Sequence, residues 1–174
     1  MIRLKELEGW RSFDTQGGIL FPWYTRPFLQ ELMNWNVREW KVFEYGAGDS
    51  TLWWRQNAKM VQSVDTNKAW AERSGAIWVT NKQDFLSCPE SLAQDEKYDC
   101  IVIDGEPVEW RDECTEHALR CVRSGGKIII DNYKQNTVSL GEWPLTDRQL
   151  APFPVSIFKE PSHPDWKTAC WTIF

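Results

Sequence analysis

The chain has 174 residues, which favours a single domain with a sizeable core. Its composition, 42% hydrophobic and 26% charged, is ordinary for a globular protein. The formal net charge of -5 argues against a nucleic-acid partner, because nucleic-acid-binding proteins use basic surfaces to displace counterions from phosphates.

The cysteines and the N-terminal segment narrow the possible class of protein further. The five cysteines are odd in number and lack C-x-x-C spacing, so neither a disulfide framework nor a zinc knuckle is predicted. The N-terminal segment (1–13) has no apolar signal core, and no run approaches the ~18 apolar residues of a membrane span. We therefore expect a cytoplasmic protein with no membrane partner.

The chain begins with an irregular, aromatic segment that leads into a helix. Pro27 suits the first turn of a helix over PFLQELMNW (27–35). Trp23 and Tyr24 precede it, and two interpretations stay open. These two side chains close over a bound ligand as a lid, or they cover the end of a sheet.

From residue 40 onward, short β-rich runs alternate with helical patterns. Strands are predicted at 41–45, 60–65, 76–79, 98–105 and 127–131. Helices are predicted at 51–58, 66–74 and 110–122. Thr66 and Gly75 are expected to cap and end the second helix, and Gly125 and Gly126 to close the third. A polar segment separates the third strand from YDCIVIDG (98–105), whose apolar core is typical of a strand buried on both faces.

The helix predicted at 110–122 has one apolar stripe. Its charged residues, Arg111 among them, fall off that stripe. The pattern then changes after residue 140. FPVSIF (153–158) and TACWTIF (168–174) are separated by too few residues for a crossover helix, which predicts an antiparallel hairpin at one edge of the sheet.

This order of elements predicts the fold class. Alternating strands and helices indicate an α/β protein with a doubly wound, mostly parallel seven-stranded sheet, helices on both faces and a C-terminal antiparallel hairpin. We expect one domain over residues 1–174, in which residues 1–39 form an N-terminal lid or cap and residues 40–174 form the core.

Acidic residues follow the strands of this predicted sheet. They are Glu44, Asp65, Asp104 and Asp131 at four strand ends, and Asp84 after the third strand. In an open α/β sheet, ligands bind outside the carboxyl ends of the strands. One such carboxylate is unremarkable because aspartate favours turns, but five along one edge indicate a binding site.

FEYGAGDST (43–51) connects the first strand to its helix through two glycines. A dinucleotide fingerprint would have a third glycine where Thr51 stands. Glu44 and Asp49 flank the loop, and their charges would repel a pyrophosphate. A ligand with ribose, adenine and positive charge fits better, and S-adenosylmethionine is such a molecule; its single carboxylate could use backbone amides at the helix N-terminus.

From residue 40 to the end, the chain resembles the class I S-adenosylmethionine-dependent methyltransferases, which have a Rossmann-like core. The motifs that carry the resemblance are FEYGAGDST (43–51), VD (64–65), QDF (83–85), YDCIVIDG (98–105) and GGKIIIDN (125–132), followed by the closing hairpin. Their order and intervals make the signal specific.

The resemblance implies roles for individual residues. Gly46 and Gly48 let the cofactor approach the backbone, and Glu44 serves its amino-acid end. Asp65 binds the ribose hydroxyls, as its place after the second strand also suggests. Asp84 binds the adenine amino group, Phe85 lies against the adenine, and Asp104 sits beside the methionine part and the acceptor. The predicted cofactor site also includes Ala47, Ser50, Thr51, Thr66 and Gly105.

IDG (103–105) followed by IDN (130–132) is similar to metal-dependent catechol and caffeoyl-CoA-type O-methyltransferases. That narrower resemblance implies a Mg²⁺ ion held by Asp104, Asp131 and Asn132, which offer oxygen ligands. The alternative is that Asp131 and Asn132 shape a turn. The chain also departs from those enzymes at Pro107, where they carry a lysine that is a candidate base.

Together these patterns predict an S-adenosylmethionine-dependent methyltransferase for a small-molecule acceptor, with oxygen the favoured acceptor atom and Asp104 the catalytic candidate. A nicotinamide-dependent oxidoreductase and a non-catalytic S-adenosylmethionine-binding module stay as alternatives. The short segment before the core leaves little for a specificity cap, so a homo-oligomer that completes the pocket is a further expectation.

Overall fold

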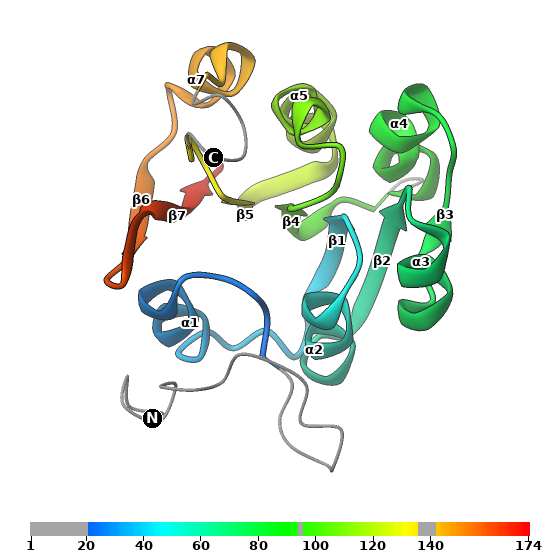
Figure 1. Cartoon of the computed structure of the whole chain (residues 1–174), viewed down its shortest axis with the longest axis horizontal. Helices are drawn as coiled ribbons and strands as arrows, with labels where there is room; N and C mark the ends of the chain where they lie inside the picture. The colour runs from blue at the N-terminus through cyan, green and yellow to red at the C-terminus, as the bar shows by residue number, and fades with distance from the viewer. Residues whose placement is uncertain (1–20, 94–95, 136–141) are drawn as a thin grey trace.

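The structure is a computed structural model that describes residues 21–93, 96–135 and 142–174. A seven-stranded sheet with the order β3-β2-β1-β4-β5-β7-β6 forms its centre (Figure 1). The strands are β1 (Lys41–Tyr45), β2 (Met60–Asp65), β3 (Ile77–Trp78), β4 (Tyr98–Ile103), β5 (Val122–Asp131), β6 (Val155–Glu160) and β7 (His163–Thr172). The first five strands are parallel, and β7 runs antiparallel to both β5 and β6. The predicted fold class is therefore confirmed.

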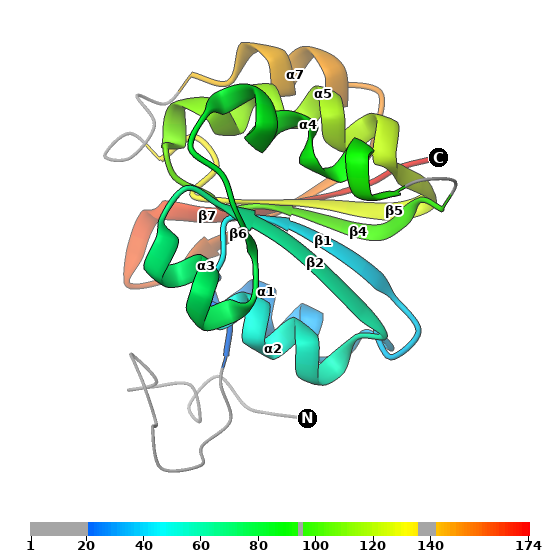
Figure 2. The same ribbon diagram turned by 90° about the vertical axis from the view of Figure 1, so that its right-hand side faces the viewer.

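Helices cover both faces of the sheet. They are α1 (Arg26–Leu32), α2 (Asp49–Asn57), α3 (Lys68–Ser74), α4 (Lys82–Ala93), the 3₁₀ helix η2 (Val108–Trp110), α5 (Arg111–Cys121) and α7 (Pro144–Leu150). Figure 2 shows α1, α2 and α3 on one face and α4, α5 and α7 on the other. Among the described residues, no helix is long and apolar enough to cross a membrane.

The central strand β4 shows how the sequence builds this core. Successive side chains of a strand point to opposite faces. Cys100 and Val102 accordingly pack with α1 and α2, whereas Ile101 and Ile103 pack with α4 and α5. All four side chains are fully buried, which confirms the prediction of a strand covered on both faces. All five cysteines of the chain are free and buried.

The two aromatic residues before the sheet, Trp23 and Tyr24, differ in burial. Tyr24 is fully buried, and its hydroxyl accepts a hydrogen bond of 3.2 Å from Trp54 Nε1. Trp23, in contrast, is 53% exposed. The adjoining helix α1 is fastened to the hairpin, because Arg26 Nε donates to Glu160 Oε1 at 2.7 Å. Residues 1–20 of the predicted lid lie outside the described part of the chain.

Several sequence-based boundaries differ from the structure by a few residues, and three of the differences concern how helices begin and end. The polar segment after β3 folds as α4, because Asn81 Oδ1 accepts from the backbone N–H of Asp84 at 2.9 Å and begins the helix. Helix α3 is capped by Asn67 and not by Thr66, although Gly75 ends it as predicted, with φ of 69°. Helix α5 ends at Cys121, and β5 begins directly at Val122, which pairs with Tyr98. Gly125 and Gly126 therefore lie inside β5.

Candidate functional site

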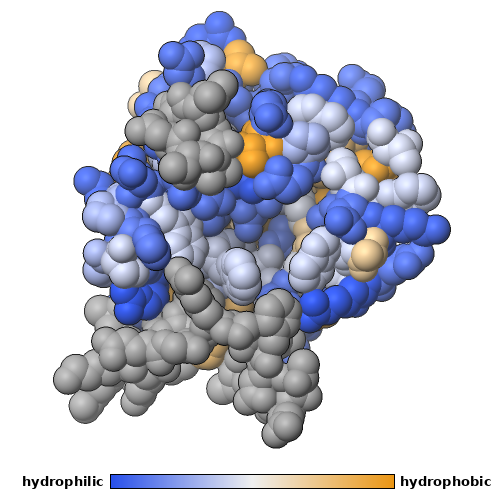
Figure 3. Space-filling view, viewed as in Figure 1, coloured by the Kyte–Doolittle hydropathy of each residue, from blue (hydrophilic) through white to orange (hydrophobic). Residues whose placement is uncertain are grey.

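A cavity of about 310 Å³ opens at the carboxyl ends of β1, β2 and β4. The glycine loop after β1 forms one wall, and Asp65 at the end of β2 forms a second with Asn67. Asp104 and Glu106 after β4 form a third. Two partly exposed tryptophans, Trp23 and Trp70, also line the cavity. Figure 3 shows a hollow in the middle of this face, bordered mostly by polar residues.

The two glycines of the loop have different surroundings. Gly46 has φ of +95°, and a Cβ placed on it would lie 2.7 Å from the Cα of Gly105. The loops after β1 and β4 are therefore in backbone contact, which only glycine allows here. Gly48 lines the cavity, and a Cβ placed on it would meet no atom within 4 Å. Gly46 thus allows the loops after β1 and β4 to pack together, whereas Gly48 leaves room for a ligand.

Glu44, the acidic residue of β1, is fully buried beneath the loop. Its carboxylate accepts hydrogen bonds from the hydroxyls of Ser50, at 2.5 Å, and Thr51. Burial raises the pKa of Glu44 to about 8, although these hydroxyls oppose the shift. Thr51 Oγ1 also accepts from the backbone N–H of Gly48 at 3.0 Å. A third glycine at position 51 would supply neither contact.

Asp65 ties the end of β2 to the glycine loop. Its Oδ2 accepts from the N–H of Ala47 at 2.7 Å, and its Oδ1 accepts from the N–H of Asn67 at 2.6 Å. Burial raises the pKa of Asp65 above its ordinary value despite these two donors. Two carboxyl groups with raised pKa values, those of Asp65 and Glu44, therefore line the same cavity.

Asp104 forms an ion pair with Arg111, which the sequence pattern does not predict to lie at the site. Arg111 falls off the apolar stripe of α5, yet it is only 3% exposed, and its Nη1 lies 3.2 Å from Asp104 Oδ1. Helical periodicity alone misplaces Arg111 because its charge is satisfied by groups outside the helix. Burial raises the pKa of Asp104 to about 6, and Arg111 opposes that shift.

Asp131 is the last residue of β5 and Asn132 follows it, and their side-chain oxygens already have partners. Asp131 accepts from the Thr168 hydroxyl at 2.5 Å and from Trp166 Nε1 at 3.0 Å. Burial, and then the nearby charge of Asp104, raise the pKa of Asp131 to about 8. Asn132 Oδ1 accepts from Arg111 at 3.2 Å.

These contacts bear on the metal expected at Asp104, Asp131 and Asn132. A divalent cation prefers free oxygen ligands, but these oxygens accept from Arg111, Trp166 and Thr168. Within residues 21–93, 96–135 and 142–174, no group of three or more histidine, cysteine or acidic side chains is placed to hold a metal ion. The three residues as they stand do not fit a divalent cation.

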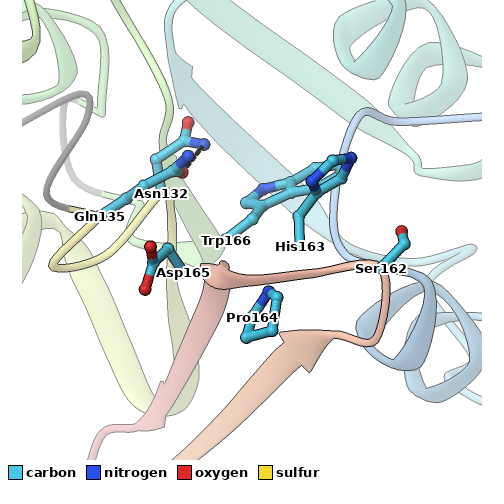
Figure 4. Close-up of a pocket in the computed structure, with 7 residues that line it drawn as sticks. All are labelled: Asn132, Gln135, Ser162, His163, Pro164, Asp165 and Trp166. Carbon is cyan, nitrogen blue, oxygen red and sulfur yellow. Dashed lines mark hydrogen bonds between the residues drawn. The ribbon is translucent and has the colours of Figure 1, made fainter.

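A second cavity, of about 360 Å³, lies beside Asn132 at the tip of the β6–β7 hairpin. Figure 4 shows Asn132 and Gln135 on the loop after β5, joined by a hydrogen bond of 2.7 Å, and His163 and Trp166 on β7. Arg111 contacts both Asn132 in this cavity and Asp104 in the first. Arg111 thus connects the walls of the two cavities.

The remaining predicted site residues lie outside the first cavity's lining. Asp84 is exposed and accepts from Asn81 Nδ2 at 2.7 Å. Phe85 is 1% exposed and packs between the rings of Tyr45 and Trp110, at centroid distances of 5.4 and 5.6 Å. The adenine contacts of Asp84 and Phe85 therefore stay predictions.

Two further predicted residues brace the walls. The Thr66 hydroxyl donates to the carbonyl of Glu106 at 2.9 Å and joins the second wall to the third. Gly105 packs closely against Gly46 and the Phe85 ring. Sequence reasoning missed Asn67, Trp70, Glu106 and Arg111. For Arg111 a signal existed, because a basic residue at the start of a helix opposes the helix dipole.

Comparison with solved structures identifies the fold. The O-methyltransferase TomG from Streptomyces achromogenes, in complex with S-adenosylmethionine, aligns with a TM-score of 0.62 and 15% identity, over 89% of this chain and 82% of that chain. MycE methyltransferase from the mycinamycin pathway, in complex with Mg and S-adenosylhomocysteine, aligns at 0.58 and 14%, over 91% and 51%. An rRNA methylase from Streptococcus thermophilus aligns at 0.52 and 14%, over 79% and 89%.

The sequence itself matches no protein-family model and no curated protein. At identities this low, the structural likeness establishes the fold and not the substrate. The chain therefore has the fold of the class I S-adenosylmethionine-dependent methyltransferases.

Proposed function

We propose that this protein is an S-adenosylmethionine-dependent methyltransferase that acts on a small-molecule acceptor, with oxygen as the acceptor atom. The observation that carries the proposal is the cavity at the glycine loop, which Glu44, Asp65 and Asp104 line together. Three carboxyl groups in one cavity favour a ligand that brings positive charge, because a nearby opposite charge stabilises their ionised form. S-adenosylmethionine carries two such charges, an ammonium and a sulfonium.

The residues around the cavity suit the parts of this cofactor. Asp65 would accept hydrogen bonds from the ribose hydroxyls, and Glu44 would serve the ammonium end. The backbone N–H groups at the start of α2 would bind the cofactor carboxylate. The exposed ring of Trp70 would cover part of the adenosyl group. When bound, the cofactor would supply a methyl group that its positive sulfur activates.

The chain's own part in catalysis would be to align the acceptor and exclude water. Asp104 lines the cofactor cavity, and Arg111 connects it to Asn132 in the second cavity. We propose that the acceptor enters through this second cavity and that Asp104 receives the proton of its hydroxyl group. In the Asp104→Asn variant we expect weaker cofactor binding and, in addition, a turnover at saturating cofactor reduced by about 100-fold or more, measured as S-adenosylhomocysteine release. Turnover equal to that of the wild type would contradict this role.

Two alternatives have weaker support. A nicotinamide dinucleotide would place its pyrophosphate near buried Glu44, at a loop whose third glycine position is Thr51. A non-catalytic binding module would bind the cofactor but transfer no methyl group to any acceptor. A panel of hydroxylated small molecules, with an rRNA fragment added as a separate arm, distinguishes these cases.

Replacing Asp65 tests the cofactor assignment directly. We expect Asp65→Ala to weaken binding of S-adenosylhomocysteine by about 10- to 100-fold, because hydrogen bonds to a charged group contribute about 1.5–3 kcal/mol. Isothermal titration calorimetry measures this affinity. Glu72→Ala, an exposed acidic residue on α3, is the matched control. Wild-type affinity in a folded Asp65→Ala protein would contradict the assignment.

A further inference from the structure

The guanidinium of Arg111 is enclosed at the carboxyl ends of β4 and β5. Its Nε donates to the Gly105 carbonyl at 2.7 Å, and its Nη2 donates to the Asp104 carbonyl at 3.0 Å. Its Nη1 donates to the Asp131 carbonyl at 3.1 Å and to Asn132 Oδ1 at 3.2 Å, and it also pairs with Asp104 Oδ1 at 3.2 Å. The side chain is only 4% exposed.

All of these partners are oxygen atoms. They comprise three backbone carbonyls, one side-chain amide and one carboxylate, which is the kind of set that holds Mg²⁺ or Ca²⁺ in proteins. Arginine keeps its positive charge at any ordinary pH. A divalent cation at the same oxygens would meet that charge at close range, where repulsion is poorly screened. The cation that these oxygens surround is therefore the guanidinium group of Arg111.

We propose that Arg111 takes the place of a divalent cation at this site, so that the protein works without a metal. Arg111 is then a positioning residue, which fixes Asp104 at the first cavity and Asn132 at the second. The inference that Arg111 replaces a divalent cation rests on the contacts of Arg111 alone. The positioning of an acceptor rests, in addition, on the proposed function.

The test compares the thermal unfolding of four proteins with and without Mg²⁺, Mn²⁺ or Ca²⁺ at constant ionic strength. They are the wild type, Arg111→Ala, Arg111→Lys and, as matched control, Arg120→Ala, which removes an exposed arginine from the same helix. The measurement is made without cofactor, so failure of the proposed function leaves its result standing.

We expect divalent cations to leave the melting temperature of the wild type and of Arg120→Ala unchanged. Arg111→Ala should melt several degrees lower, because it leaves buried oxygens without a donor, and Mg²⁺ should restore part of that loss in a saturable way. Arg111→Lys keeps the positive charge and should be insensitive to Mg²⁺; it preserves the test if Arg111→Ala does not fold.

A second readout separates positioning from a merely structural role. With an acceptor in hand, Mg²⁺ should also restore turnover of Arg111→Ala, and chelation with EDTA should leave wild-type turnover unchanged. Two results would overturn the proposal. One is a saturable Mg²⁺-induced rise in the wild-type melting temperature that Asn132→Ala abolishes. The other is a folded Arg111→Ala protein that no divalent cation stabilises.

Discussion

Gly46→Ala is expected to destabilise the whole fold. The added Cβ would lie 2.7 Å from the Cα of Gly105 and 2.9 Å from the carbonyl carbon of Asp104, at a backbone φ of +95°. Backbone strain and overpacking each cost about 1–3 kcal/mol. A loss of about 3 kcal/mol would lower the melting temperature by about 6–12 °C in a domain of this size.

Gly48→Ala provides the matched comparison in the same loop. Gly48 has extended backbone, and its added Cβ would meet no atom within 4 Å. Stability should therefore change by less than about 0.5 kcal/mol. The methyl group would instead occupy the cavity, and we expect it to weaken S-adenosylhomocysteine binding about 10-fold or more through overpacking.

Urea unfolding and calorimetry on both variants check this pair of expectations. Gly46→Ala should lose stability, whereas Gly48→Ala should lose affinity for S-adenosylhomocysteine. If Gly46→Ala is as stable as the wild type, the backbone contact between the two loops is not required. If Gly48→Ala binds S-adenosylhomocysteine normally, the cavity beside Gly48 is not the cofactor site.

Glu44→Gln is expected to change how stability depends on pH. The pKa of Glu44 is about 8 in the folded protein, against about 4.5 for an ordinary glutamate in the unfolded chain. The native state therefore holds this proton more tightly than the unfolded chain does. Stability from this group is fully present below about pH 4.5 and is lost as the pH rises through about 8, by up to roughly 5 kcal/mol.

Glutamine cannot ionise, so the variant should lose this pH dependence. We expect the variant and the wild type to differ little near pH 5, and the variant to be the more stable protein above about pH 8. Chemical denaturation at a series of pH values measures the difference, with Glu72→Gln as an exposed control. Parallel stability profiles for Glu44→Gln and the wild type would show that Glu44 titrates normally. Above about pH 8, where Glu44 is ionised, Glu44→Gln should also bind S-adenosylmethionine more weakly, because it removes a carboxylate near the ammonium.

The parts of the fold that sequence reasoning predicted depend on local patterns. The strand YDCIVI and the loop FEYGAGDST are recognisable because apolar runs and glycines follow directly from burial and backbone geometry. The convergence of Glu44, Asp65 and Asp104 on one cavity follows from parallel strands, whose carboxyl ends share an edge.

Other features depend on contacts that local patterns do not contain. Helix α4 looked like a polar segment because its start depends on the side-chain bond between Asn81 and Asp84. The burial of Arg111 is set by backbone carbonyls at two strand ends, that of Asp104 just after β4 and that of Asp131 at the end of β5. Helical periodicity describes one helix against an apolar core and does not describe a charge that neighbouring strand ends neutralise.

Ligand-induced thermal stabilisation tests the central claim most directly. The wild type is melted alone and with S-adenosylmethionine, S-adenosylhomocysteine, NAD or NADP, and Gly48→Ala serves as the control for the site. A ligand at about 100 times its dissociation constant stabilises by about 2.7 kcal/mol, a rise of about 5–10 °C here. We expect that rise with the two adenosyl ligands, a smaller rise in Gly48→Ala, and none with the nicotinamide dinucleotides. Stabilisation by NAD or NADP alone, or by none of the four ligands, would contradict the account.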